Sequence, residues 1–263
     1  NPGSSRMPEL PDNVPATRPG AGSTMREALL EWSNGAVLHD PKCGFEWTPA
    51  RFSSDTWRAE GAYLGEDTGG RGTVVFVRAG NQEWAIRHYR RGGLAARFSE
   101  DRFVWTGRDR TRSFREWHLL RHLSALGLPV PAPVAAACWR DGWRYTADLV
   151  TQRIPGAQPL SARLALAPIS ESVWAALGAC VGRFHDAGVC HADLNAGNLL
   201  LDTGDHPWLI DFDRGRLRIP GEWRQRNLAR LLRSLNKITS KRPGLHFSAR
   251  DWQSFVAGYH GRP

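Results

Sequence analysis

The chain has 263 residues, 41% of them hydrophobic and 10% aromatic, which is enough to form the core of one large domain or of a two-lobed one. Its 35 lysines and arginines exceed its 26 aspartates and glutamates, and the net charge of +9 favours an anionic partner: nucleic acid, an acidic membrane surface or a phosphorylated substrate. The sequence contains no run of 18 apolar residues, no signal-peptide core and no C-x-x-C pair, which argues against a membrane span, secretion, a zinc site and a disulfide framework.

The first 60 residues carry few legible signals. Residues 1–24 are rich in Pro, Gly, Ser and Ala, and we expect a disordered tail there. Residues 25–32 are a candidate for a short helix, and we expect the first strand near Ala62.

A glycine-rich turn at residues 66–73 precedes two predicted strands, and the second strand ends in W-A-I-R at Arg87. Backbone N–H groups at Gly70 and Gly72 can approach phosphates because no Cβ lies in the way. Taken alone, such a turn usually only reverses the chain, and Arg87 alone fits a solvated strand charge. Together they are also compatible with a phosphate-binding hairpin followed by a cation.

A helix is predicted from Ser113, with leucines at helical spacing and Gly127 as its stop. Glu116 has two interpretations. It completes a capping-box pattern with Ser113, or it forms an ion pair with a phosphate-binding cation. Two further strands, at residues 134–139 and 144–154, lead into a Pro-Gly exit at residues 151–156, where we expect a hinge between two lobes.

A helix from Ser170 to Gly188 delivers the chain into the pattern H-x-D-x-x-x-x-N, which runs from His191 to Asn198. A short hydrophobic strand, a turn, a second strand and D-F-D at residues 211–213 follow. Phosphoryl transfer needs a carboxylate near the attacking hydroxyl and oxygen ligands for Mg²⁺, and Asp193, Asn198 and Asp211 supply them. The alternative is a hydrophobic hairpin with surface polar residues, and the joint spacing favours the phosphotransfer site. We interpret His191 as structural.

Ten basic residues but a single acidic one, Glu222, lie between positions 214 and 242. The pattern is helical from Trp223, and Arg226, Arg230, Arg233 and Lys237 fall on one stripe. A solvated helix face is the usual explanation of such a stripe. Four like charges would repel each other, however, which favours an anionic partner.

Four motifs together resemble those of the 3-deoxy-D-manno-octulosonic acid (Kdo) kinases, a family of lipopolysaccharide kinases within the protein-kinase-like superfamily. They are G-G-R-G-T-V from Gly69, R-H-Y-R-R-G-G from Arg87, H-A-D-L-N-A-G-N-L-L-L-D from His191 and I-D-F-D-R-G-R from Ile210. The resemblance runs from about residue 35 to about residue 260. It implies a bilobal α+β fold with a β-rich N-lobe at residues 25–154 and a compact, mainly helical C-lobe at residues 155–263.

The resemblance also implies an activity, the ATP-dependent phosphorylation of the 4-hydroxyl of Kdo on a lipid A precursor. Such an enzyme would be a peripheral protein on the cytoplasmic face of a Gram-negative inner membrane. Transferred to this chain, the roles are catalysis by Asp193, Mg²⁺ binding by Asn198 and Asp211, and nucleotide binding by Gly70, Gly72, Arg87 and Glu116. Charge alone suggests acceptor-binding roles for Arg214, Arg216, Arg226 and Arg230.

The chain departs from ordinary protein kinases at several positions. Ala192 precedes the catalytic Asp, Asn195 replaces the catalytic-loop Lys, and Asp213 replaces the Gly of D-F-G. The segment between Asp211 and the Trp223 helix is too short for a long activation loop. These changes argue against a regulated protein kinase.

Two other functions are compatible with the same residues. A related sugar kinase could act on lipopolysaccharide heptose or on another small molecule, although the basic C-terminal half argues against an aminoglycoside. A membrane-associated pseudokinase scaffold is favoured by Arg87. The presence of Asp193, Asn198 and Asp211 argues against it. We expect ATP, the lipid acceptor and an anionic membrane as partners, with no nucleic acid and no obligate protein partner.

Overall fold

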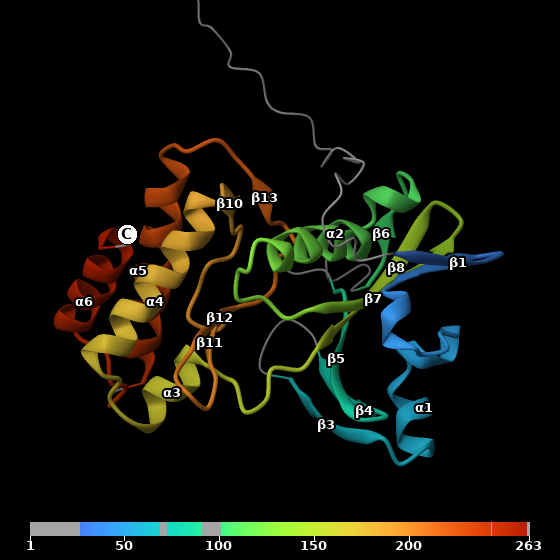
Figure 1. Cartoon of the computed structure of the whole chain (residues 1–263), viewed down its shortest axis with the longest axis horizontal. Helices are drawn as coiled ribbons and strands as arrows, with labels where there is room; N and C mark the ends of the chain where they lie inside the picture. The colour runs from blue at the N-terminus through green and yellow to red at the C-terminus, as the bar shows by residue number, and fades with distance from the viewer. Residues whose placement is uncertain (1–26, 69–72, 91–100, 243, 262–263) are drawn as a thin grey trace, which may run out of the picture.

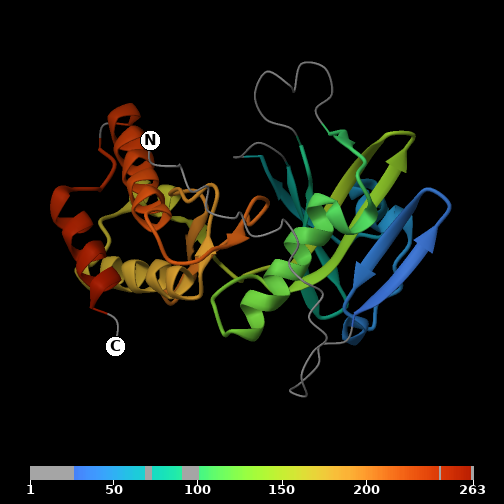
Figure 2. The same cartoon turned by 90° about the horizontal axis from the view of Figure 1, so that it is seen from above.

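The computed structural model describes residues 27–68, 73–90, 101–242 and 244–261. Figure 1 shows an antiparallel sheet at one end of the molecule and a group of helices at the other, and Figure 2 shows the same two bodies from above. The described residues therefore form a bilobal α+β fold, as predicted.

The N-terminal lobe is built on a sheet whose described strands follow the order β1-β2-β7-β8-β5-β4-β3, with β6 paired to β8. All neighbouring strands are antiparallel. Their bounds are β1 Ala28–Trp32, β2 Gly35–His39, β3 Tyr63–Asp67, β4 Val74–Ala79, β5 Gln82–His88, β6 Phe103–Val104, β7 Pro133–Asp141 and β8 Arg144–Gln152. The short helix α1 Ser54–Ala59 and 3-10 turns at Pro41–Cys43, Pro49–Phe52 and Arg108–Arg110 complete the lobe.

Side chains alternate along a strand, so consecutive residues of β7 point to opposite faces of the sheet. Both faces are covered, and both sets of side chains are buried. Ala135 and Ala137 face a tryptophan-rich cluster that includes Trp84, whereas Ala136 and Cys138 face the main core of the molecule. Small residues on β7 let both layers pack closely against the sheet.

Helix α2 Arg112–Ala125 covers the main-core face of the sheet with Phe114, Trp117 and Leu120. Its N-cap residue is Thr111, and the Ser113 hydroxyl donates to the carbonyl oxygen of Ala137 at 2.7 Å rather than capping the helix. The capping-box interpretation of Ser113 is therefore wrong. The side chain of Glu116, which that interpretation assigned to the helix terminus, is directed to other partners.

The expectation for residues 25–32 is also wrong, because Ala28–Trp32 is strand β1 and the sheet begins well before Ala62. Local propensity favours helix in this segment. Pairing with β2, which in turn pairs with β7, outweighs that preference. The tail predicted at residues 1–24 lies outside the described residues.

The C-terminal lobe contains α3 Leu160–Leu166, α4 Glu171–Asp186, α5 Trp223–Lys241 and α6 Ala249–His260. Its short strands form two small sheets that position the site: β9 Gln158–Pro159, β11 Leu199–Leu201 and β12 Pro207–Leu209 in one, and β10 Val189–Cys190 with β13 Arg216–Leu217 in the other. No helix in the described part of the chain is long and apolar enough to cross a bilayer.

Candidate phosphotransfer site

Helix α4 leads directly into the predicted catalytic loop. Its N-cap is Ser170, as expected, and the chain leaves the helix at Gly188 with φ of +74°. A Cβ at Gly188 would lie 2.8 Å from the carbonyl oxygen of Arg218, so this turn needs glycine for both its conformation and the close approach of the chain after β13. The turn places His191 and Asp193 at the end of β10.

His191 is buried and orients the loop backbone, as predicted. Its Nδ1 lies 3.2 Å from the backbone N–H of Asp193 and accepts from it, so Nε2 donates to the carbonyl oxygen of Ile210 at 2.9 Å. Burial lowers the pKa of His191, which keeps the ring neutral. His191 thus connects the backbone just before Asp211 to the loop that carries Asp193.

Two asparagine side chains fix the shape of this loop. Asn195 donates to the carbonyl oxygen of Asp193 at 2.9 Å and accepts from the N–H groups of Gly197 and Asn198. Asn198 donates from Nδ2 to the same carbonyl oxygen at 2.9 Å, so its amide presents the oxygen on the other side. The β11–β12 hairpin then carries the chain to Asp211, with Asp202 closing the predicted turn.

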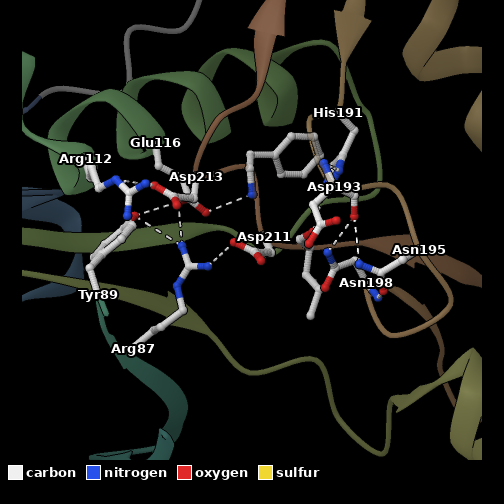
Figure 3. Close-up of polar contacts among 12 residues, drawn as sticks. Arg87, Tyr89, Arg112, Glu116, His191, Asp193, Asn195, Asn198, Asp211 and Asp213 are labelled. Atoms are coloured by element: carbon white, nitrogen blue, oxygen red, sulfur yellow. Dashed lines mark hydrogen bonds and ion pairs between the residues drawn. The ribbon is translucent and has the colours of Figure 1, made fainter. Parts of the chain in front are cut away.

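Asp211 adopts φ of +65°, a conformation that is costly for a residue with a side chain and is typical of functional sites. Its carboxylate pairs with Arg87 on β5, as Figure 3 shows. Burial would raise the pKa of Asp211, but the charge and hydrogen bond of Arg87 outweigh burial and lower it. Asp211 is therefore an anion at the junction of the two lobes.

Arg87 contacts two carboxylates, and its pair with Asp211 joins the two lobes. In addition to Asp211, it contacts Glu116 on α2, whose side chain is 2% exposed. The other oxygen of Glu116 accepts from the backbone N–H of Phe212 at 3.0 Å. Sheet, helix and D-F-D segment meet at this ion pair, and the pairing interpretation of Glu116 is the one that the geometry supports.

The electrostatics of the group follow from burial and charge. Burial alone would lower the pKa of Arg87, but Glu116, Tyr89 and Asp211 raise it well above its usual value. Burial raises the pKa of Glu116 to about 6, and Arg87 opposes the rise. At neutral pH the cluster therefore holds a fixed cation between carboxylates.

Asp213, the residue that replaces glycine in D-F-G, lies against α2. Its Oδ1 is 3.2 Å from Nε of Arg112, whose guanidinium also stacks on Phe103. Together with the bond from Phe212 to Glu116, this contact attaches the D-F-D segment to α2 at two points.

Asp211 and Asn198 form a chemically suitable pair of ligands for a hard divalent cation, because one offers a carboxylate and the other an amide oxygen. The described residues contain no cluster of three or more His, Cys, Asp or Glu side chains that could hold a metal. Mg²⁺ usually takes one or two protein carboxylates and completes its shell with water and substrate phosphates. The residues present therefore fit that ion.

The four arginines predicted to bind the acceptor have different surroundings. Arg214 and Arg216 lie in an exposed segment after the D-F-D residues. Arg226 pairs with Glu222, whereas Arg230 contacts Asp193. Gly70 and Gly72 lie outside the described residues.

The predicted hinge follows the end of β8. There the N–H groups of Gln152 and Arg153 donate to the carbonyl oxygens of Ala132 and Glu83. These bonds hold the last residue of β8 and the residue after it to the N-terminal lobe, and the chain leaves the sheet after them.

Sequence reasoning missed several residues of the site. Tyr89 donates to Glu116 at 2.6 Å, and its position two residues after Arg87, directly after β5, was the available signal. Asn227 and Ser234 contact the predicted catalytic loop from α5, and only their helical spacing could have suggested this.

Comparison with known proteins gives a consistent result. Residues 54–259 match the model of the lipopolysaccharide kinase (Kdo/WaaP) family. The chain is 47% identical over 209 residues to a 3-deoxy-D-manno-octulosonic acid kinase of Stenotrophomonas maltophilia, a match covering 79% of this chain and 83% of that protein. It is 41% identical over 230 residues to the kinase of the same name from Photobacterium profundum, covering 88% of this chain and 97% of the relative.

Proposed function

Since the chain belongs to the lipopolysaccharide kinase (Kdo/WaaP) family, we propose that it transfers the γ-phosphoryl group of ATP to a hydroxyl of Kdo in lipopolysaccharide biosynthesis. The observation that carries the assignment to this site is the bridge from Arg87 to Glu116 and Asp211, close to the loop of Asp193 and Asn198. This arrangement supplies a fixed cation for phosphates, a base and oxygen ligands at one junction.

In the proposed mechanism, ATP lies between the lobes and Arg87 neutralises its phosphates, with Glu116 holding the guanidinium in place. Asp193 orients the acceptor hydroxyl and accepts its proton. The hydroxyl oxygen forms the new bond to the γ-phosphorus, the bond to the bridging oxygen breaks, and ADP leaves. Asn198 and Asp211 would hold Mg²⁺, which offsets phosphate charge when bound.

We propose the 4-hydroxyl of Kdo on a lipid A precursor as the acceptor, at the cytoplasmic face of the inner membrane. The exposed segment at residues 214–219 supports a membrane-facing acceptor site, since it alternates three arginines with Leu217 (37% exposed) and Ile219 (70% exposed). Each basic side chain near an anionic leaflet contributes about 1 kcal/mol of binding. Apolar side chains between such charges are typical of surfaces that lie at the membrane interface.

Single-turnover transfer from [γ-³²P]ATP to Kdo-bearing lipid A precursor, with and without Mg²⁺, tests the catalytic proposal. We expect Mg²⁺-dependent label on the sugar, and a loss of rate of about 10²- to 10⁴-fold in Asp193→Asn. Asp205→Asn is the matched control, because Asp205 lies in the β11–β12 turn and pairs with Arg163 on α3. A rate in Asp193→Asn equal to that of the control would remove Asp193 from the mechanism. Transfer to a separately supplied heptose-bearing acceptor, with none to the Kdo-bearing precursor, would change the acceptor.

Co-sedimentation with vesicles tests the membrane proposal separately. We expect binding to vesicles with anionic lipid and little binding to neutral ones. Arg218→Glu and Ile219→Asp should each weaken the binding. Equal binding to both vesicle types would contradict the proposed electrostatic contribution.

A further inference from the structure

Helix α5 presents one polar face to the catalytic loop. Asn227 donates to the carbonyl oxygen of His191 at 3.0 Å, and Ser234 accepts from the N–H of Ala196 at 3.3 Å. Residues 227, 230 and 234 lie at i, i+3 and i+7, so they share one side of the helix. The loop is thus held by α5 on both sides of Asp193.

Between these two contacts, Arg230 reaches the carboxylate of Asp193. Its Nε and Nη2 lie 3.1 and 2.6 Å from the same oxygen, Oδ1. Because two donors of one planar guanidinium bind the same oxygen, they restrict the rotation of the Asp193 carboxylate as well as its distance from Arg230.

The position of Arg230 is fixed by the buried side of its own helix. Leu228, Leu231 and Leu235 are 6%, 0% and 0% exposed and pack in the main core. The stem of Arg230 therefore starts from an anchored backbone, although its side chain is 44% exposed. A flexible surface arginine would have no such restriction.

The catalytic loop itself places no cation beside Asp193 at the position where protein kinases carry one. Asn195 stands there, and its amide is used within the loop, by the carbonyl oxygen of Asp193 and the N–H groups of Gly197 and Asn198. The neutral side chain shapes the backbone, and the charged contact to the carboxylate comes from α5 instead.

We propose that Arg230 is the positioning residue of the reaction. It holds the Asp193 carboxylate in the orientation that receives the acceptor proton, a role that the loop cannot supply with Asn195. The inference rests on the proposed catalytic role of Asp193. Arg230, for which charge alone suggested acceptor binding, is therefore assigned to orienting the base instead.

Steady-state kinetics of Arg230→Gln and Arg230→Lys test this role, with Arg250→Gln as the matched control. Arg250 forms an exposed ion pair with Glu171 between α4 and α6. We expect kcat of Arg230→Gln to fall about 10- to 100-fold, with KM for ATP changed less than about twofold. Arg230→Lys should recover only part of kcat, because lysine keeps the positive charge but lacks the paired N–H donors of the guanidinium. The control should keep the wild-type kcat.

Two readouts separate positioning from a merely structural effect. Since exposed ion pairs add little to stability, Arg230→Gln should unfold within about 2 °C of the wild type. In an Asp193→Asn background, Arg230→Gln should cause almost no further loss, because a positioning residue has nothing left to aim.

Two results would overturn the proposal: wild-type kcat in Arg230→Gln, with or without a rise in acceptor KM, or a faster kcat that identifies the ion pair as inhibitory. Full activity in Asp193→Asn would instead overturn the proposed base, which keeps the two failures distinct.

Discussion

Replacing Gly178 with alanine would force helices α4 and α6 apart. A Cβ at this position lies 1.9 Å from the carbonyl oxygen of Phe255 and 2.8 Å from the backbone N of Tyr259. A carbon and a carbonyl oxygen need about 3.3 Å, so α6 has to move by about 1.4 Å. Backbone atoms cannot rotate away as a flexible side chain can.

The magnitude follows from two opposing effects. Overpacking costs about 3 kcal/mol when neither side can give, and alanine recovers about 1 kcal/mol of helix propensity. The net loss of about 2 kcal/mol corresponds to a decrease in Tm of about 4 to 8 °C for a chain of this length. A shifted α6 should also weaken the 2.8 Å contact between Tyr259 and His185.

Differential scanning calorimetry measures the shift, and Gly221→Ala is the matched control. A Cβ at Gly221 would lie 3.8 Å from its nearest neighbour, the ring of Trp223, which is an ordinary van der Waals contact. This variant should therefore melt within about 1 °C of the wild type. If Gly178→Ala also melts within about 1 °C, the two helices do not pack as closely as inferred. We expect kcat of Gly178→Ala to match the wild type well below Tm, because α6 makes no contact with the loop of Asp193 among those described.

Two further predictions concern titratable groups. Burial raises the pKa of Cys138 to about 11 and that of Cys180 to about 12. Iodoacetamide should therefore leave both thiols unmodified in the folded protein and modify them in guanidinium. Labelling of either thiol in the folded protein, measured by peptide mass, would contradict their burial. The hydrogen bond to Asp148 raises the pKa of His88 above 6.5, so the folded state binds this proton more tightly than the unfolded state. The stabilisation is present below about pH 6.5 and is lost as the pH rises through the folded pKa. The difference in unfolding free energy between wild type and His88→Gln should therefore be larger at about pH 6 than at about pH 9, and equal differences would refute the pairing.

Much of the C-terminal lobe was predictable because its signals are local. The helix from Ser170, the turn at Gly188 and the hairpin after Asn198 each depend on residues close together in the chain. The spacing of Asp193 and Asn198 likewise fits one loop, and the hydrogen bond between them confirms that the loop closes on itself.

Errors arose where distant partners decide the structure. Residues 28–32 have helical propensity but form β1, because the edge of β2 offers a complete ladder of hydrogen bonds. Ser113 and Glu116 match a capping box, yet Ser113 bonds to β7 and Glu116 bonds to Arg87 and Phe212. A local pattern cannot reveal a stronger partner elsewhere in the sequence.

The sequence by itself determined the family, the bilobal α+β fold and the chemical character of the site, since residue types at short spacings carry that information. Only the tertiary structure decided which charges meet. Arg87 and Asp211 are 124 residues apart, and Arg230 and Asp193 are 37 apart. Their pairing depends on how the sheet, α2 and α5 pack, because hydrophobic burial fixes the elements and thereby places the charges.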